Sequence, residues 1–390
     1  MRVHCNMGQP RLPDQGPPNT ELTVHGTFSS TGWQGSNPPD IAIWEMLRLF
    51  HEQPRARSLY PHLAQFQPVP YVKYSGEDMK KEQATIFADR NGQVFMFRSF
   101  RARWLMDASH EVEEAINVLV GDDLENNDAL RVKCQDGVRG PHWPIIIGHH
   151  RQSATKPMLA AWHSANQDRV DAFMKLKIVQ RIINWVERVV EIVFPGVAAR
   201  FRADAAWHYR RYGIKPLFGL FWNFCLNAWF RGQRRIHCNP HTDKKNQIGV
   251  CVLVIYVLDG FVFDDDLYTW IVIWEAGVVV QLPPWTLAMY PSCLFYHFNV
   301  DVDEIEFVST KGNVRPTREN STPLGRGGQD GRRSMVFFNQ STMRTGPATD
   351  YDTLAEAKAN GHSGTIDITL TCQEAFERYV EFRPILPEYF

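Results

Sequence analysis

Three residues of the chain are of the right types and spacing to bind one divalent metal ion. His241 and Asp243 stand two positions apart where an expected strand begins, and side chains two positions apart on an extended chain point to the same side. We expect the third ligand to be His297, which lies in the apolar run 294–298. Two histidines and one carboxylate form the facial triad of non-haem Fe(II) oxygenases, which leaves octahedral positions open. Such a centre can hold a bidentate co-substrate and O₂ together.

A second pair of residues is suited to bind that co-substrate. Arg332 and Ser334 share one face of the last expected strand by the same two-residue rule, and Arg binds carboxylates through paired hydrogen bonds. The distal carboxylate of 2-oxoglutarate fits this pair. In the alternative arrangement Arg333 points inward, or both arginines are solvated at a sheet edge.

The conjunction of these motifs matters more than any one of them. The chain has 14 histidines, and a single histidine is more often a surface or core residue than a metal ligand. A bare His-x-Asp pair is equally weak as a motif. The order His, Asp, His, Arg, Ser along a strand-rich region is what favours a metal centre.

The composition indicates a folded protein with a sizeable core. The chain has 390 residues, of which 44% are hydrophobic and 12% aromatic, so it is neither disordered nor collagen-like. Its longest apolar run, residues 250–258, is about half the length of a membrane-spanning helix, and the N-terminus lacks a signal-peptide core. Seven cysteines form no Cys-x-x-Cys pair, which favours reduced thiols over disulfides or a zinc ribbon. We expect a soluble intracellular protein without membrane association.

Charge is distributed unevenly along the chain, although the net charge is only −1. Residues 156–245 carry 16 Lys and Arg against six Asp and Glu, whereas residues 246–310 carry nine acids and neither Lys nor Arg. A basic segment of this size is compatible with a phosphate-binding surface. The alternative is that its basic side chains only solvate the outer faces of helices.

Helices are expected to dominate the chain up to about residue 235. Apolar residues at spacings of three and four predict a long amphipathic helix over residues 176–190, ended by Pro195 and Gly196. Ser109 is expected to cap a helix over residues 109–120. Shorter helices are expected over residues 41–50, 353–359 and 373–382, and a strand hairpin within residues 71–101, turning at residues 89–92.

After about residue 236 the pattern changes to successive antiparallel strands. Short runs rich in Val, Ile, Phe, Tyr and Trp alternate there with turn residues, which is typical of β structure. The fold class that we predict is α+β, with a double-stranded β-helix core (a cupin-like jelly roll) supported by N-terminal helices. The expected regions are an extended or weakly ordered arm (1–40), a mixed, mainly helical supporting region with a basic surface (41–235), the catalytic core (236–345) with a mobile insertion loop (311–331), and a helical extension (346–390).

The motif order resembles that of the Fe(II)/2-oxoglutarate-dependent dioxygenase superfamily. Within this superfamily, the sequence Cys-Asn-Pro-His-Thr-Asp-Lys-Lys-Asn at 238–246, with Leu-Pro-Pro at 282–284 and Tyr-Pro-Ser at 290–292, is similar to the fungal branch of the TET/JBP DNA-base oxygenases. The likeness covers roughly residues 200–340. It implies that His241, Asp243 and His297 bind Fe(II) and that the Arg332 and Ser334 pair binds 2-oxoglutarate, with O₂ as co-substrate.

The resemblance also implies where a substrate base would bind. In TET-like enzymes an aromatic residue six positions after the Arg stacks on a flipped base, and a polar residue eight positions after it, typically His, hydrogen-bonds that base. Here these positions are Phe338 and Gln340. Asn246 and Asn239 are assigned to the same substrate site. Gln in place of His departs from the pattern, and an amide can bind either a cytosine or an adenine edge; an ordinary core role for Phe338 is the alternative.

The sequence thus predicts a dioxygenase that oxidises the methyl group of a modified DNA base, 5-methylcytosine first and N6-methyladenine second. Such an enzyme must extrude the nucleotide from the duplex, at a cost of about a few kcal/mol. We expect the DNA backbone to contact basic residues that flank the metal motif, namely Arg231, Arg234, Arg235, Lys244 and Lys245. A substrate of methylated DNA implies a nuclear location, and without such a substrate we expect a cytoplasmic one. We expect the protein to be a monomer. The alternatives are the same chemistry on a protein side chain or small metabolite, and a catalytically silent nucleic-acid-binding module.

Overall fold

The computed structural model describes most of the chain. The described residues are 2–5, 27–29, 32–34, 43–52, 59–88, 94–123, 127–135, 137, 139–151, 154–228, 236–258, 260–302, 308–310, 321–323 and 331–362. The helix expected at 373–382 and most of the insertion loop expected at 311–331 lie outside them. Within the described part, no helix is both long and apolar enough to cross a membrane.

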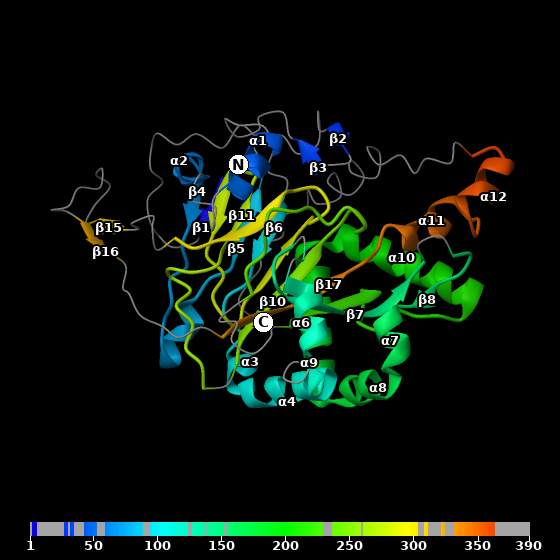
Figure 1. Cartoon of the computed structure of the whole chain (residues 1–390), viewed down its shortest axis with the longest axis horizontal. Helices are drawn as coiled ribbons and strands as arrows, with labels where there is room; N and C mark the ends of the chain where they lie inside the picture. Colours follow the sequence, from blue (N-terminus) through cyan, green and yellow to red (C-terminus); the bar gives the residue numbers. More distant parts are fainter. Residues whose placement is uncertain are drawn as a thin grey trace.

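A nine-stranded antiparallel sheet is the largest element (Figure 1). Its strands are, in spatial order, β1 (Arg2–Cys5), β5 (Thr85–Ala88), β6 (Val94–Arg98), β13 (Leu287–Tyr290), β10 (Cys251–Val257), β17 (Arg332–Phe338), β9 (Asn223–Ala228), β7 (Trp143–His150) and β8 (Met158–Leu159). The hairpin expected around residues 89–92 is confirmed as the antiparallel pair β5–β6. Strands from both halves of the sequence therefore share this sheet, with β17 between β10 and β9.

A four-stranded sheet packs against the large one. It contains β14 (His297–Val300), β11 (Trp270–Ile273), β12 (Val278–Val280) and β4 (Gln67–Val69), with β4 parallel to β12. Side chains alternate between the faces of a strand, so Ile271 and Ile273 join the core of the large sheet. Trp270 and Val272 instead pack with α1 (Ile43–Glu52) and α2 (Tyr60–Leu63). The described chain is thus a mixed α+β structure with large antiparallel sheets.

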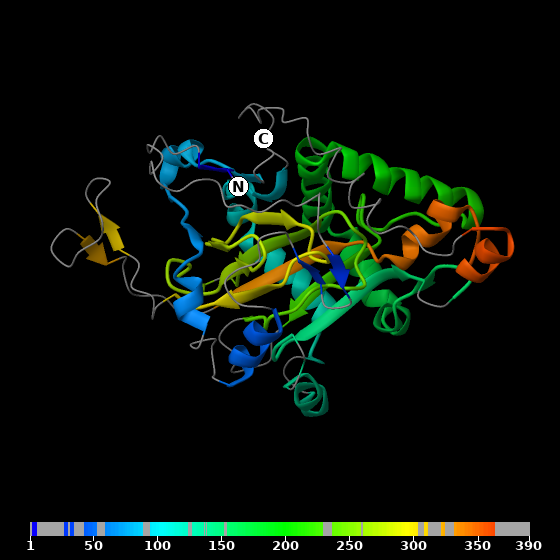
Figure 2. The same cartoon turned by 90° about the horizontal axis from the view of Figure 1, so that it is seen from above.

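Two further strand pairs are short. They are β2 (Thr27–Ser29) with β3 (Gly32–Gln34), and β15 (Val308–Thr310) with β16 (Ser321–Pro323). Figures 1 and 2 show the β15–β16 pair apart from the rest of the molecule, at the left of both views.

Three helices pack on the other face of the large sheet, namely α4 (Ser109–Val120), α8 (Gln167–Lys175) and α9 (Lys177–Val193). The other helices are η2 (Gly76–Lys81), α3 (Arg103–Asp107), α6 (Asp128–Gln135), α7 (Ala161–Ala165), α10 (Pro195–Tyr212), α11 (Thr342–Thr349) and α12 (Leu354–Ala359). The predicted long amphipathic helix is confirmed as α9, whose apolar stripe is buried. Burying one Val or Ile side chain contributes roughly 1.5–3 kcal/mol, so this stripe fixes the helical layer on the sheet.

One predicted helix boundary differs in the structure, and another is confirmed. The N-cap of α4 is Ala108, and Ser109 is already the first helical residue, without a side-chain cap hydrogen bond. Pro195 opens α10 directly after α9 ends at Val193. Proline has no amide hydrogen to lose at the first helical position, so here it starts a helix as well as following one.

Strand β17 separates the helical layer from the space between the sheets. Met335 and Phe337 pack with α4, α8 and α9 on one face. Ser334, Val336 and Phe338 face the opposite side, where the two sheets enclose a cavity. The alternation predicted for this strand is therefore present.

Several arginines of the basic segment 156–245 contact carboxylates of the chain itself. The ion pairs are Arg169 with Asp123, Arg188 and Arg202 with Glu191, and Arg211 with Asp352. Arg200 donates instead to the backbone oxygen of Ile248. These arginines hold helices and loops together.

His208 joins α10 to α11. Its side chain is 0% exposed, and Nε2 donates to the backbone oxygen of Met343 at 2.7 Å, since a carbonyl can only accept. Its ring packs against Trp222, with the ring centroids 5.1 Å apart. Burial, reinforced by Arg151, lowers the pKa of His208 to about 4. The imidazole is therefore neutral at pH 7.

We expect His208 to make stability fall on acidification between about pH 6.5 and pH 4. In this window the unfolded histidine takes up a proton that the folded one refuses. H208Q cannot take up that proton and keeps an N–H donor for Met343. Its slope of unfolding free energy against pH should be shallower by up to about 1.4 kcal/mol per pH unit. Urea unfolding from pH 4 to 7 measures this slope.

H110Q measures the effect of replacing a histidine at the surface, since His110 lies on α4 with an exposed side chain. Equal slopes for H208Q and the wild type would contradict the assignment.

Candidate metal centre

A cavity of about 1110 Å³ lies between the two sheets. Its walls come from β7, β9, β10, β13 and β17 of the large sheet, from β11 and β14 of the small sheet, and from the segment 238–246. Binding sites for small molecules commonly have about 300–1,000 Å³. The cavity therefore has room for more than one small ligand.

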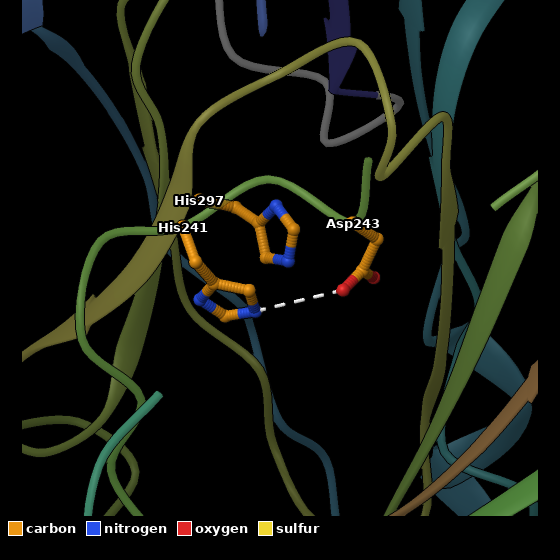
Figure 3. Close-up of side chains that lie close together, drawn as sticks. All are labelled: His241, Asp243 and His297. Carbon is orange, nitrogen blue, oxygen red and sulfur yellow. Dashed lines mark ion pairs between the residues drawn. The ribbon is translucent and has the colours of Figure 1, made fainter. Parts of the chain in front are cut away.

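The three candidate metal ligands converge in this cavity (Figure 3). One ligand atom of each of His241, Asp243 and His297 can be chosen so that all lie within 4.8 Å of one another. His241 Nε2 is 3.9 Å from Asp243 Oδ1, and the two imidazole centroids are 4.3 Å apart. Among the described residues this is the one group of three or more His, Cys, Asp or Glu side chains with such a spacing.

Backbone hydrogen bonds bring the ligands together. His241 N donates to His297 O at 3.2 Å, and His297 N donates back to His241 O at 3.0 Å. Asp243 N donates to Ser292 O at 3.0 Å. The segment that contains the His-x-Asp pair thus runs along β14 as a short strand would, and residues far apart in sequence become cross-strand neighbours.

Both histidines are held in the tautomer that a metal ion requires. Nδ1 of His241 lies 2.6 Å from Asn239 O, and Nδ1 of His297 lies 3.0 Å from Phe295 O. Because a carbonyl oxygen only accepts, each Nδ1 carries the hydrogen. Each Nε2 therefore presents a lone pair, and such Nδ1 contacts are typical of metal-binding histidines.

The electrostatics of the site favour a cation. Burial lowers the pKa of His241 to about 3, with a further contribution from His297, and burial also lowers the pKa of His297. Burial alone would raise the pKa of Asp243, but Arg139 and the two histidines hold it below its ordinary value. At neutral pH the site contains one carboxylate and two neutral imidazoles, the protonation state in which these groups bind metals.

Sequence reasoning does not find three residues that support the metal ligands or Ser334. Arg139, between α6 and β7, places Nη2 2.9 Å from Asp243 Oδ1 although its side chain is 52% exposed. Ser292 accepts from Asn246, and Asn227 donates to Ser334 Oγ at 3.0 Å. Arg139 lies about a hundred residues before the motif in no periodic pattern, so nothing in the sequence marks it. Ser292 belongs to the Tyr-Pro-Ser stretch at 290–292, which is one of the sequence motifs that pointed to this site.

Arg332 and Ser334 both line the cavity wall. The Arg332 side chain is buried, with 2% of its surface exposed, and its Nη1 donates to Ile236 O at 3.2 Å. Arg333 does not line the cavity, and its register partner on β10 is Tyr256. Of the two arrangements considered for this strand, the structure has the one in which Arg332 faces the cavity.

The predicted substrate residues that the structure describes also line this cavity. They are Asn239, Asn246, Phe338 and Gln340, together with Lys244 and Lys245, which are exposed. Phe338 packs beside Cys225 and Cys251. Arg231, Arg234 and Arg235 lie outside the described residues, so their predicted contacts with DNA stay predictions.

The donor set fits Fe(II) with 2-oxoglutarate. Two imidazole nitrogens and one carboxylate oxygen face a common point, and this set is characteristic of non-haem iron. The buried guanidinium of Arg332 beside the Ser334 hydroxyl is suited to a carboxylate.

Comparisons with known proteins find a distant structural likeness. No protein-family model and no curated protein sequence matches the chain. Among solved structures the chain is similar to NgTET1 in complex with 5mC DNA, with 12% sequence identity and a TM-score of 0.40. The match covers 67% of this chain and 77% of that chain. A likeness at this level does not assign the chain to a family, so the functional conclusion has to come from the site itself.

We expect H241A and H297A each to weaken Mn(II) binding by more than about 100-fold, because loss of a direct ligand should exceed the 10–100-fold effect of a supporting residue. Isothermal titration calorimetry with Mn(II) measures this. H110A, at the exposed position on α4, should bind as the wild type does. Wild-type affinity in either of the two variants would exclude that residue as a ligand.

Proposed function

We propose that the protein is an Fe(II)- and 2-oxoglutarate-dependent dioxygenase that oxidises the methyl group of a modified DNA base. The preferred substrate in this proposal is 5-methylcytosine, with N6-methyladenine second. The strands of the two sheets that lie within residues 236–345 would form a double-stranded β-helix core. The region 41–235, which we expected to be mainly helical, adds strands β4 to β9 to these sheets as well as supporting helices. A DNA substrate would place the enzyme in the nucleus. We further propose that it acts as a monomer.

One observation carries the proposal. His241, Asp243 and His297 converge in a cavity whose wall also presents Arg332 and Ser334. The metal ligands come from β14 and the 241–243 segment, and the anion-binding pair comes from β17. A structural metal site would be closed by a fourth protein ligand and would not need a buried arginine beside it.

Arg332 and Ser334 would bind the carboxylate of 2-oxoglutarate that is distant from the metal. Asn227 donates to the Ser334 hydroxyl oxygen at 3.0 Å, so the Ser334 hydrogen is available to a carboxylate. Arg332 adds charge and a planar pair of donors. Because Arg332 is buried, its ion pair with the co-substrate would be poorly screened by water and salt.

The part of the wall further along β17 would hold the base. Phe338 and Gln340 follow Arg332 and Ser334 along the same face of β17 and its extension, so a ring stacked on Phe338 would have Gln340 at its edge. An amide donates and accepts, which suits a cytosine or an adenine edge. Lys244 and Lys245 are exposed beside the cavity, where a phosphate backbone would pass.

The chain's own residues would position reactants and exclude water. Fe(II) with 2-oxoglutarate and O₂ supplies an oxidant strong enough to hydroxylate a methyl group. His241, Asp243 and His297 would fix the orientation of the metal. Phe338, packed beside two buried thiols, would hold the flipped base so that its methyl group faces the metal and not the solvent.

We expect the protein, with Fe(II) and 2-oxoglutarate, to convert 5-methylcytosine in duplex oligonucleotides to its hydroxymethyl form with formation of succinate. Mass spectrometry of nucleosides and a succinate assay measure this, with H241A as the inactive control. Oxidation of a peptide or small metabolite while methylated DNA stays unchanged would overturn the DNA assignment. Binding of DNA without any succinate, even with added Fe(II), would favour a silent binding module.

We expect R332M to raise the KM for 2-oxoglutarate by about 10- to 1,000-fold, since charge-assisted hydrogen bonds contribute about 1.5–3 kcal/mol and a bidentate pair contributes more than one of them. Mn(II) affinity without co-substrate should be unchanged, because Arg332 is not a metal ligand. R332K should recover part of the loss. A KM equal to that of the wild type in R332M would show that 2-oxoglutarate binds elsewhere.

A further inference from the structure

We propose that Asn246 is a positioning residue that holds Asp243 as a monodentate metal ligand. This role rests on the proposed metal centre, and it differs from the base contact that the sequence resemblance implies for Asn246. The evidence lies in the turn that follows Asp243 and in the hydrogen bonds of the Asn246 amide.

A tight turn places Asn246 beside Asp243. Asn246 N donates to Asp243 O at 2.7 Å, which closes a turn over Lys244 and Lys245. In such a turn the first and fourth residues lie close together. The two lysines are exposed at its tip, whereas Asp243 is buried and Asn246 is half-buried. Because Asn246 follows Asp243 by three residues across this turn, the Asn246 side chain lies beside the metal ligand Asp243.

The side-chain amide of Asn246 hydrogen-bonds to Asp243. Its Nδ2 lies 3.2 Å from Asp243 Oδ2 and 3.1 Å from Ser292 Oγ. An ionised carboxylate only accepts hydrogen bonds, so the nitrogen of the amide, and not its oxygen, must face Asp243. The Ser292 hydroxyl also hydrogen-bonds to Asp243 and helps to lower its pKa. Asn246, Ser292 and Asp243 thus form a closed group of hydrogen bonds.

The two oxygens of Asp243 consequently have different surroundings. Oδ1 lies 3.9 Å from His241 Nε2 and 2.9 Å from Nη2 of Arg139, whose side chain is 52% exposed. Oδ2 accepts from Asn246, whose amide nitrogen also contacts Ser292. A metal ion bound to Oδ1 beside the histidines would replace the exposed Arg139, whereas the Asn246 amide would stay on Oδ2. Asp243 would therefore supply one donor atom. A bidentate carboxylate would occupy a position that a chelating co-substrate needs.

Buried contacts fix the far side of the same turn. Gln247 N donates to Asn339 O at 2.6 Å, and Gln247 Nε2 donates to Asp204 Oδ2 on α10 at 2.8 Å. Two residues on, a Cβ at Gly249 would lie 2.9 Å from Arg200 Nη2, and its φ is +154°. The chain can pass this close to α10 only with glycine at that position. Helix α10 therefore holds the turn that carries Asn246.

Gln340 provides the matched comparison. Asn246 and Gln340 form an isolated β-bridge, and both line the cavity. Both side chains end in an amide, but the hydrogen bonds from Asn246 reach Asp243 and Ser292. If Asn246 positions Asp243, replacing Asn246 should change metal binding, and replacing Gln340 should leave metal binding unchanged.

The experiment compares N246A, N246L, S292A and Q340A in the full chain. Mn(II) affinity is measured by calorimetry without co-substrate or DNA, and coordination number is followed by the visible absorption spectrum of bound Co(II). We expect N246A and the nearly isosteric N246L to weaken Mn(II) binding by about 10- to 100-fold and to change the Co(II) spectrum. S292A should also weaken Mn(II) binding and change the Co(II) spectrum. Q340A should match the wild type in both measurements. Circular dichroism and thermal unfolding confirm that each variant is folded.

The outcomes separate this proposal from the proposed function. Wild-type Mn(II) affinity and an unchanged Co(II) spectrum in folded N246A and N246L would overturn the positioning role, and a change only in the preference between methylated bases would do the same. A wild-type protein that binds neither Mn(II) nor Co(II) would overturn the metal centre itself. A wild-type protein that binds metal but oxidises no DNA would refute the substrate assignment and leave the role of Asn246 supported by the metal measurements.

Discussion

The pair of backbone hydrogen bonds between His241 and His297 is the constraint on which the candidate site depends. It joins a segment that follows the helical region to a strand in the small sheet, and it sets the two imidazoles 4.3 Å apart. Asp243 is positioned from the same segment through the backbone of Ser292. Main-chain hydrogen bonds therefore set the positions of the three ligand residues, and their side chains supply the donor atoms. Substitutions that shift the register of this pairing would disperse all three ligands at once.

Electrostatic interactions stabilise the ligand arrangement that the backbone hydrogen bonds set. A buried carboxylate is costly unless cations or donors surround it, and Asp243 has Arg139 on one oxygen and Asn246 on the other. The two histidines stay neutral because burial disfavours their charged forms. The site is thus prepared for a divalent cation before one arrives, with little reorganisation of its protons.

Much of this site could be predicted from sequence because it rests on local rules. The two-residue period of a strand correctly placed Arg332, Ser334 and Phe338 on one face, and apolar spacing correctly located helix α9. The contribution of Arg139 could not be predicted, because it depends on how a loop before β7 folds over the cavity. Asn246 was found as a site residue, but the partners of its amide depend on a turn and on Ser292. Long-range pairing, unlike periodicity, leaves no pattern in a single chain.

Strand β17 lies in the interior of a sheet whose two sides come from different regions of the sequence. Its neighbours are β10, from the second half, and β9, which precedes residue 236. A fragment that began at residue 236 would lack β9, β7 and β8, and one whole edge of β17 would lose its hydrogen-bonding partners. Exposed edges of this kind pair readily with other chains. A fragment that keeps the candidate site therefore has to begin before β7, so that β7 and β9 remain in the sheet and β9 pairs with residues 334–338 of β17.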